Sequence, residues 1–257
     1  MSHALDGPRL KVSRANMHLE SLKERVQGFI DGNPYGVVAD YDGQTEKCVL
    51  RTQVFDHPPQ DWGIIIGDIV HNLRSALDQL VWQLALLQTS TPYDRAAFSI
   101  TTTPNRYRDN GRRLVQDLTP RQEALIKWFQ PYRRGNKTES DFLWLLHDIN
   151  NTDKHRVIQT IGTVFAMQGL GFGNMRGFDL YNMNVYGGQR LEDGAPVADF
   201  TLVQTAPDAY MDMHPEITPN IEFDEGSSAV KDMPLVSTLL DIVAHVERII
   251  PCFERFF

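Results

Sequence analysis

Residues 61–87, DWGIIIGDIVHNLRSALDQLVWQLALL, decide the fold more than any other stretch of the chain. Their apolar side chains recur at helical spacing and Asp61 can cap the start, which predicts one long helix with a broad apolar face. The apolar positions are Ile66, Ile69, Val70, Leu73, Leu77, Leu80, Val81 and Leu84. A helix of this kind buries its face against other helices, so the stretch predicts a helical bundle.

Four further segments carry the patterns of bundle helices. Apolar side chains at helical spacing mark the first and the last of them, and the last is expected to close the bundle with the first. Thr119-Pro120 and Asp141 are typical residues at a helix start and mark the other two. The four segments are residues 13–30, 120–129, 141–149 and about 232–251.

Two parts of the chain have the pattern of β-structure. Residues 37–50 predict a hairpin whose turn contains Asp42-Gly43. After Arg156, short β-prone runs are separated by Gly, Asp, Asn and Pro, which predicts a small antiparallel sheet. These runs are residues 157–165, 178–186, 198–203 and 217–223. The glycine-rich residues 169–173 are expected to form a hairpin or a flexible loop, because no phosphate-binding motif surrounds them.

The sequence therefore predicts an α+β fold. An antiparallel helical bundle carries a small N-terminal hairpin and an antiparallel β insert before the C-terminal helix. We expect a single domain over residues 1–257, with the bundle in residues 11–156 and 232–255 and the insert in about 157–231.

The composition is that of a folded globular protein, since 42% of the 257 residues are hydrophobic and 23% are charged. No apolar run reaches the length of a membrane span and the N-terminus lacks the apolar core of a signal peptide, so we expect a cytoplasmic protein without membrane association. Cys48 and Cys252 show no metal-ligand spacing, and we expect both to be buried, reduced thiols. No cofactor and no metal is indicated.

The charge is unevenly distributed around a net value of −8. Residues 104–137 contain nine Lys or Arg and three Asp or Glu, interleaved with aromatic rings such as Trp128 and Tyr132. Cations beside flat rings suit a phosphate backbone with unstacked bases. The candidate nucleic-acid-binding residues are Arg106, Arg108, Arg112, Arg113, Arg133 and Arg134. The alternative is that Trp128 and Phe129 are core residues of a short helix whose exposed face is basic.

The long helix also has a polar face. Asp68, His71, Ser75 and Asp78 recur three or four residues apart, with Arg74 at the edge, so their side chains share one side of the helix. Such a row can supply a general acid and base or hold a ligand. The alternative is a solvated face with internal ion pairs.

A second polar run, HDINNTDKHR at residues 147–156, follows directly on apolar residues. If the helix continues through it, Asp148, Thr152 and His155 share a face. The alternative is a helix end, where asparagines favour turns and basic residues complement the helix dipole. Neither polar run has a glutamate near its histidine, which argues against a two-metal site of the bundle type.

Residues 71–80, HNLRSALDQL, resemble the signature helix of the HEPN superfamily. Its members are all-helical bundle proteins, many of them metal-independent ribonucleases of toxin and defence systems. The family pattern is an arginine followed four to six residues later by a histidine, on a helix that faces its twin in a homodimer. Arg74 matches the arginine, whereas Gln79 stands where the histidine is expected and cannot titrate. The resemblance implies a bacterial bundle protein, a homodimer and RNA as a partner.

The leading hypothesis is that the chain binds RNA or another phosphate-bearing ligand, either as a metal-independent ribonuclease or as a degenerate relative of one. In the ribonuclease version His155 replaces the missing histidine as acid and base, while Arg74 and Arg156 stabilise charge on the phosphate. His71 and Asp78 are further candidate catalytic residues.

Two alternatives stay open. One is a non-enzymatic module that binds a protein or a ligand, with the polar helix faces forming a buried network. The other is a metal-dependent small-molecule enzyme that uses His71, Asp78, His147 and His155.

Overall fold

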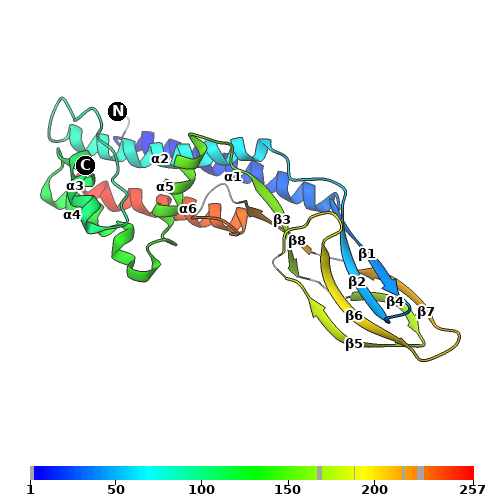
Figure 1. Ribbon diagram of the computed structural model, residues 1–257. Helices are drawn as coiled ribbons and strands as arrows, with labels where there is room; N and C mark the ends of the chain where they lie inside the picture. The colour runs from blue at the N-terminus through cyan, green and yellow to red at the C-terminus, as the bar shows by residue number, and fades with distance from the viewer. Residues whose placement is uncertain (1–2, 167–169, 188, 216–217, 225–228) are drawn as a thin grey trace. The chain divides into compact units, whose positions relative to one another are not determined.

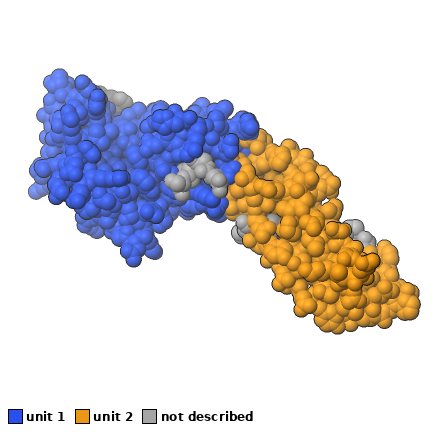
Figure 2. Space-filling model, in the orientation of Figure 1, with its two compact units in different colours: residues 1–23, 60–159, 223–257 blue, residues 24–59, 160–222 orange. Residues whose placement is uncertain are grey.

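The computed structural model describes residues 3–166, 170–187, 189–215, 218–224 and 229–257. The chain divides into two compact units, which Figure 2 shows in different colours. The helical unit comprises residues 1–23, 60–159 and 223–257, and the β-rich unit comprises residues 24–59 and 160–222. The predicted α+β fold, with helices and an antiparallel sheet, is confirmed. The single domain over the whole chain stays a prediction.

In the described part of the chain, the helical unit is built around long helices that follow the predicted segments closely (Figure 1). They are α1 (Asp6–Asp31), α2 (Asp61–Leu86), α5 (Phe142–Asp153) and α6 (Leu235–Ile249). Shorter helical segments complete the unit: α3 (Pro104–Asp109), η1 (Gly111–Val115), α4 (Pro120–Trp128), η2 (Pro131–Lys137) and η3 (Ile250–Phe256). The helix α1 begins earlier than its apolar spacing indicated.

The apolar face predicted for α2 is the centre of the helical core. Every apolar position that defined this face is buried, and α5 and α6 pack against the helix. The predicted start of the helix is right, but the predicted cap is wrong. Gln60 occupies the N-cap in a helical conformation and makes no side-chain cap bond.

Two glycines of α2 let the segment that leaves α5 lie directly on the helix. A Cβ on Gly63 would stand 2.2 Å from the Ile158 carbonyl oxygen, and a Cβ on Gly67 would stand 2.3 Å from Asp153 Oδ1. Both distances are far below van der Waals contact. The close approach is therefore possible only because glycine has no side chain.

Polar caps define the short helices. Thr119 and Gln122 form a capping box at the start of α4, where the sequence predicted a helix. Thr103 caps α3 by accepting a hydrogen bond from the Arg106 amide. The helix α3 was not predicted, because six residues are too few for an apolar period to be visible.

The β-rich unit joins the predicted hairpin and the predicted insert in one sheet. The hairpin strands β1 (Tyr35–Asp42) and β2 (Lys47–Val54) lie beside β6 (Pro196–Gln204) and β5 (Phe178–Val185), in the order β1-β2-β6-β5. All neighbours in this sheet are antiparallel. Leu50, Phe200 and Leu202 are buried in its core.

Two smaller pairs accompany the sheet. They are β3 (Thr160–Ala166) with β8 (Thr218–Phe223), and β4 (Leu170–Arg176) with β7 (Tyr210–Pro215). The strand β4 corrects the expected hairpin or flexible loop at the glycine-rich run, because its residues pair with a strand distant in sequence. Gly169 and Ile217 lie outside the described residues.

The two cysteines were expected to be buried, reduced thiols. Neither is in a disulfide, and Cys48 is buried, but Cys252 is exposed. Within the described residues, no helix has both the length and the apolar character that a membrane crossing requires.

Candidate functional site

The predicted catalytic residues Arg74 and Asp78 of α2 bind the backbone of Phe98. Arg74 Nη2 lies 2.8 Å from Asp78 Oδ1 and donates to the Phe98 carbonyl oxygen at 2.6 Å. Asp78 Oδ1 accepts from the Phe98 amide at 2.9 Å. These bonds and the ion pair fix the segment after α2 on the helix, and they engage Arg74 Nη2 and Asp78 Oδ1.

Burial governs the ionisation of this pair. It lowers the pKa of Arg74, and the neighbouring Asp78 carboxylate opposes that shift. It raises the pKa of Asp78, which the Arg74 guanidinium opposes. The Arg74 side chain is only 15% exposed, and its Nη1 has no hydrogen-bond partner among the described residues. The pair is therefore a partly buried structural ion pair.

His147 of α5 is a histidine whose ionisation is affected by Arg74. Burial, together with the positive charges of Arg74 and Lys154, lowers the pKa of His147 to about 4, and Asp148 opposes this shift. Its Nε2 lies 2.9 Å from Asn151 Nδ2, one turn later on the same helix. The ring is therefore neutral near pH 7 and accepts this hydrogen bond.

The sequence analysis named His147 only in the metal-dependent alternative. The four-residue spacing between His147 and Asn151 was the available signal for their bond.

His155 and Arg156 lie beyond the end of α5, so the helix does not continue through the polar run and the alternative of a helix end applies. The amides of both residues bond to the Thr152 carbonyl oxygen at 3.0 Å, and both side chains are exposed. His71 is exposed on α2. Burial raises the pKa values of Asp78 and Asp153, and the nearby His71 opposes both shifts. The structure thus groups His71, Arg74 and Asp78 with His147 and Lys154.

Metal ligation was part of one alternative. Among the residues that the structure describes, no three His, Cys, Asp or Glu side chains lie close enough to hold a metal ion. The polar residues on α2 and α5 bond to one another or to backbone instead.

The second candidate site is the segment from α3 to η2, which lies at one end of the helical unit (Figure 1). Gln130 holds this segment to the residues after α2, because its amide Nε2 donates to the Ser99 carbonyl at 2.5 Å and its Oε1 accepts from the Thr101 amide at 3.0 Å. The Phe129 ring packs near Phe253 of η3, with 6.3 Å between centroids. The segment is therefore anchored from both sides.

Trp128 at the end of α4 is the exposed aromatic ring of this segment. Its side chain is 66% exposed, and the Arg133 guanidinium lies over the indole, 5.4 Å from the ring centroid. The alternative in which Trp128 is a core residue is wrong, and Phe129 is half-buried. A flat ring and a cation thus face solvent together.

Several other predicted binding arginines have local partners. Arg108 and Arg112 lie 3.6 Å from Asp109 and Glu123 carboxylate oxygens. Arg113 lies over the ring of Tyr93 at 5.5 Å. All three guanidinium groups stay exposed, and only the charges of Arg108 and Arg112 have a carboxylate nearby.

Five cations of the segment have no carboxylate partner within the described chain, and all are exposed. They are Arg106, Arg113, Arg121, Arg133 and Lys137. Arg121 and Lys137 were not among the candidate binding residues, although both belong to the basic run.

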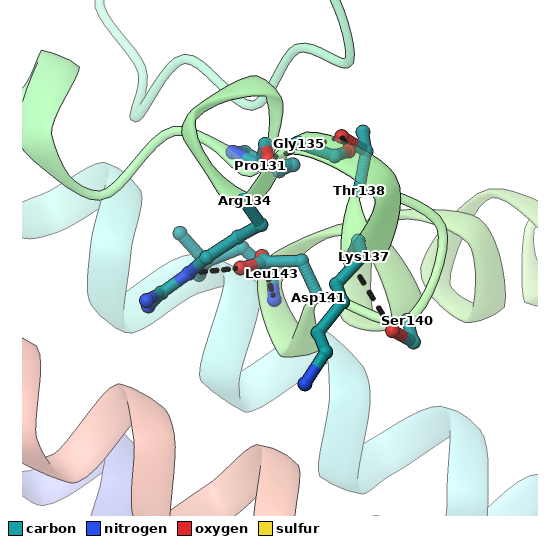
Figure 3. Close-up of polar contacts among 8 residues, drawn as sticks. All are labelled: Pro131, Arg134, Gly135, Lys137, Thr138, Ser140, Asp141 and Leu143. Carbon is teal, nitrogen blue, oxygen red and sulfur yellow. Dashed lines mark hydrogen bonds and ion pairs between the residues drawn. The ribbon is translucent and has the colours of Figure 1, made fainter.

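Arg134 has a structural contact instead. Its Nε donates to Asp141 Oδ2 at 3.1 Å, and Asp141 Oδ1 accepts from the Leu143 amide at 3.0 Å, capping α5 (Figure 3). The Asp141 side chain is 2% exposed, whereas that of Arg134 is about half exposed. The ion pair thus joins η2 to the start of α5.

The turn between them is held by hydroxyl groups, which Figure 3 also shows. Thr138 Oγ1 donates to the Gly135 carbonyl at 2.7 Å, and Ser140 Oγ donates to the Lys137 carbonyl at 3.2 Å. Gly135 has a φ of 59°, which favours glycine. The Lys137 ammonium makes no contact with the other residues drawn.

Comparison with known proteins adds no family to this description: no family model, no curated protein and no solved structure matches the chain.

Proposed function

We propose that the protein binds single-stranded nucleic acid, with RNA as the first candidate, on the surface from α3 to η2, and that it does so without cleaving it. The observation that carries the proposal is the exposed indole of Trp128 with the Arg133 guanidinium over it. This surface is called the basic surface below, and its defining residues are Arg106, Arg113, Arg121, Trp128, Arg133 and Lys137.

A solvent-facing indole supports binding of an unpaired base. Stacking of a base on an aromatic side chain is worth about 1–3 kcal/mol and tolerates any sequence, because every base has a π face. The same ring is of little use to a duplex, whose bases are already stacked. The arrangement at Trp128 therefore favours a single strand.

The unpaired cations supply the second requirement. A phosphate backbone is bound by Lys and Arg that are not neutralised locally, and each such contact releases counterions. The basic surface has five exposed cations without a carboxylate partner among the described residues. They lie within the segment that carries Trp128, although the net charge of the chain is −8.

Binding is favoured over cleavage by the state of the proposed catalytic residues. Arg74 is engaged by Asp78 and the Phe98 carbonyl, and Gln79 cannot titrate. His155 follows the end of α5 instead of sharing its face. The expected HEPN-like relationship and the homodimer remain part of the proposal. Light scattering of the purified protein tests whether it is a dimer.

The test is fluorescence anisotropy with a labelled single-stranded RNA, a matched DNA strand and an RNA duplex, in chelator and across a salt series. We expect salt-sensitive binding that favours the single strands, with the RNA intact after incubation. Arg121→Gln, Arg133→Gln and Lys137→Gln together should weaken binding at least about tenfold and lower the salt slope.

The matched control removes the same number of exposed positive charges elsewhere in the helical unit, as Arg14→Gln, Arg156→Gln and Arg248→Gln. This variant should bind almost as the wild type does. Equal losses in the two variants, or no binding at low salt, overturn the proposal. Cleavage that Arg74→Ala abolishes in a folded protein restores the ribonuclease hypothesis.

A further inference from the structure

The helical unit has a groove that is lined by none of the residues of the basic surface. It has a volume of about 310 Å³ and is lined by Arg9, Val12, Ser13 and Asn16 of α1 and by Glu247, Ile250 and Pro251 of the C-terminal segment. This volume is at the lower end of the range for small-molecule sites.

Two polar bridges between α1 and the C-terminal segment bound the groove. Asn16 Nδ2 donates to Glu247 Oε1 at 3.3 Å, and Arg9 forms an ion pair with Glu254. Arg9 and Asn16 are seven residues apart on a helix, so the bridges are separated by about 10 Å along its axis. The two bridges thus mark the ends of the groove along α1.

The floor of the groove is apolar. Val12 and Ile250 are almost fully buried, and Pro251 adds an exposed apolar wall. Ser13 and Asn16 add a hydroxyl and an amide to the lining. A ligand therefore needs an apolar body to cover the floor and a small polar group at one end.

The charges of the lining residues decide which polar group fits. Arg9 is already compensated by Glu254, and Asp6 stands 3.8 Å away. Glu247 is bound by a neutral amide and has no ion pair among the described residues. The uncompensated charge of the groove is therefore a carboxylate beside an apolar floor.

We propose that this groove binds a small organic amine, with its ammonium group at the Glu247 carboxylate and its apolar body over Val12, Ile250 and Pro251. An ammonium group supplies the positive partner that the Glu247 carboxylate lacks. It can bond to the carboxylate oxygen that does not accept from Asn16. The site does not depend on nucleic-acid binding.

The probe is phenethylamine, compared with phenethyl alcohol and phenylacetate by titration calorimetry and by shifts in protein NMR spectra. The amine should bind and the alcohol should bind about tenfold more weakly, because only the charge differs at similar size. Phenylacetate should not bind. Equal binding of the amine and the alcohol, or no binding of the amine at millimolar concentration, overturns the proposal.

Glu247→Gln keeps an acceptor for Asn16 and removes the charge, so it should weaken amine binding about tenfold while thermal unfolding stays unchanged. Asp241→Asn is the matched control, because Asp241 is exposed on the same helix and does not line the groove. It should leave the affinity unchanged. A similar loss in both variants indicates non-specific attraction of cations by an acidic protein and contradicts the assignment.

Discussion

Arg74 and Asp78, one turn apart on α2, form an ion pair with 2.8 Å between Nη2 and Oδ1, and both also bind the backbone of Phe98. The pair thereby fixes the segment that leads from α2 to the basic surface. Two residues that the sequence indicated as candidate catalytic residues thus hold the segment after α2 against the helix.

Arg74→Ala should lower the free energy of unfolding by about 2–4 kcal/mol, because it leaves the Asp78 carboxylate partly buried without its counter-ion and removes a donor from the Phe98 carbonyl. Urea denaturation measures this change. Arg108→Ala, which breaks an ion pair whose side chains are both mostly exposed, is the control and should have little effect. Equal stability of Arg74→Ala and wild type would contradict the structural role.

Gly63→Ala should destabilise the protein, although alanine is the better helix former. The new Cβ would stand 2.2 Å from the Ile158 carbonyl oxygen, so backbone has to move, at a cost of about 1–3 kcal/mol. Gly28→Ala on α1 is the matched control, because its Cβ meets nothing within 4 Å. Thermal unfolding should show opposite signs for the two variants, with Gly28→Ala stabilised by up to about 1 kcal/mol. Two shifts of the same sign would refute the close packing.

Stability should fall in mild acid because of His147. Its pKa is about 4 in the folded protein and 6.5 without burial, so the unfolded chain takes up the proton first as the pH is lowered. The contribution is complete above pH 6.5 and is lost as the pH falls toward 4, with a size on the order of 1–2 kcal/mol after solvent screening. The denaturation midpoint of His147→Gln should change less between pH 6.5 and 4 than that of the wild type. The same pH dependence in both proteins would show that His147 does not cause the loss of stability.

Asp141 should tolerate asparagine better than alanine. Asparagine keeps the oxygen that caps the Leu143 amide and loses only the ion pair to the half-exposed Arg134. Alanine loses both, and the free energy of unfolding should fall by about 1–2 kcal/mol. Guanidinium denaturation of the two variants distinguishes these losses. If Asp141→Asn lowers the free energy of unfolding as much as Asp141→Ala does, the ion pair and not the cap is the stabilising contact.

The main helices were predictable because their apolar faces recur over many turns. The predicted start of α2 is confirmed, whereas the predicted cap is wrong, because Asp61 lies inside the first turn and Gln60 occupies the N-cap. The joining of the hairpin with the later strands was not predictable, because pairing such as Val49 with Asp199 has no local signal.

The candidate sites were predictable only in part. The spacing of Arg74 and Asp78 indicated an internal ion pair, but their common target, Phe98, lies in a segment without periodicity. The basic run was evident in the sequence. Whether Trp128 or Phe129 faces solvent depends on the packing of Phe129 near Phe253, which no local pattern contains.

The proposed function depends most directly on Trp128, and the decisive measurement is the affinity of Trp128→Ala for a labelled single-stranded RNA at low salt. The loss of stacking should weaken binding by about 1–3 kcal/mol, whereas Trp128→Phe should retain most of the affinity. Trp82→Ala, which removes a partly exposed tryptophan from α2 outside the basic surface, should bind like the wild type. A folded Trp128→Ala protein that binds the RNA as tightly as the wild type would contradict the account.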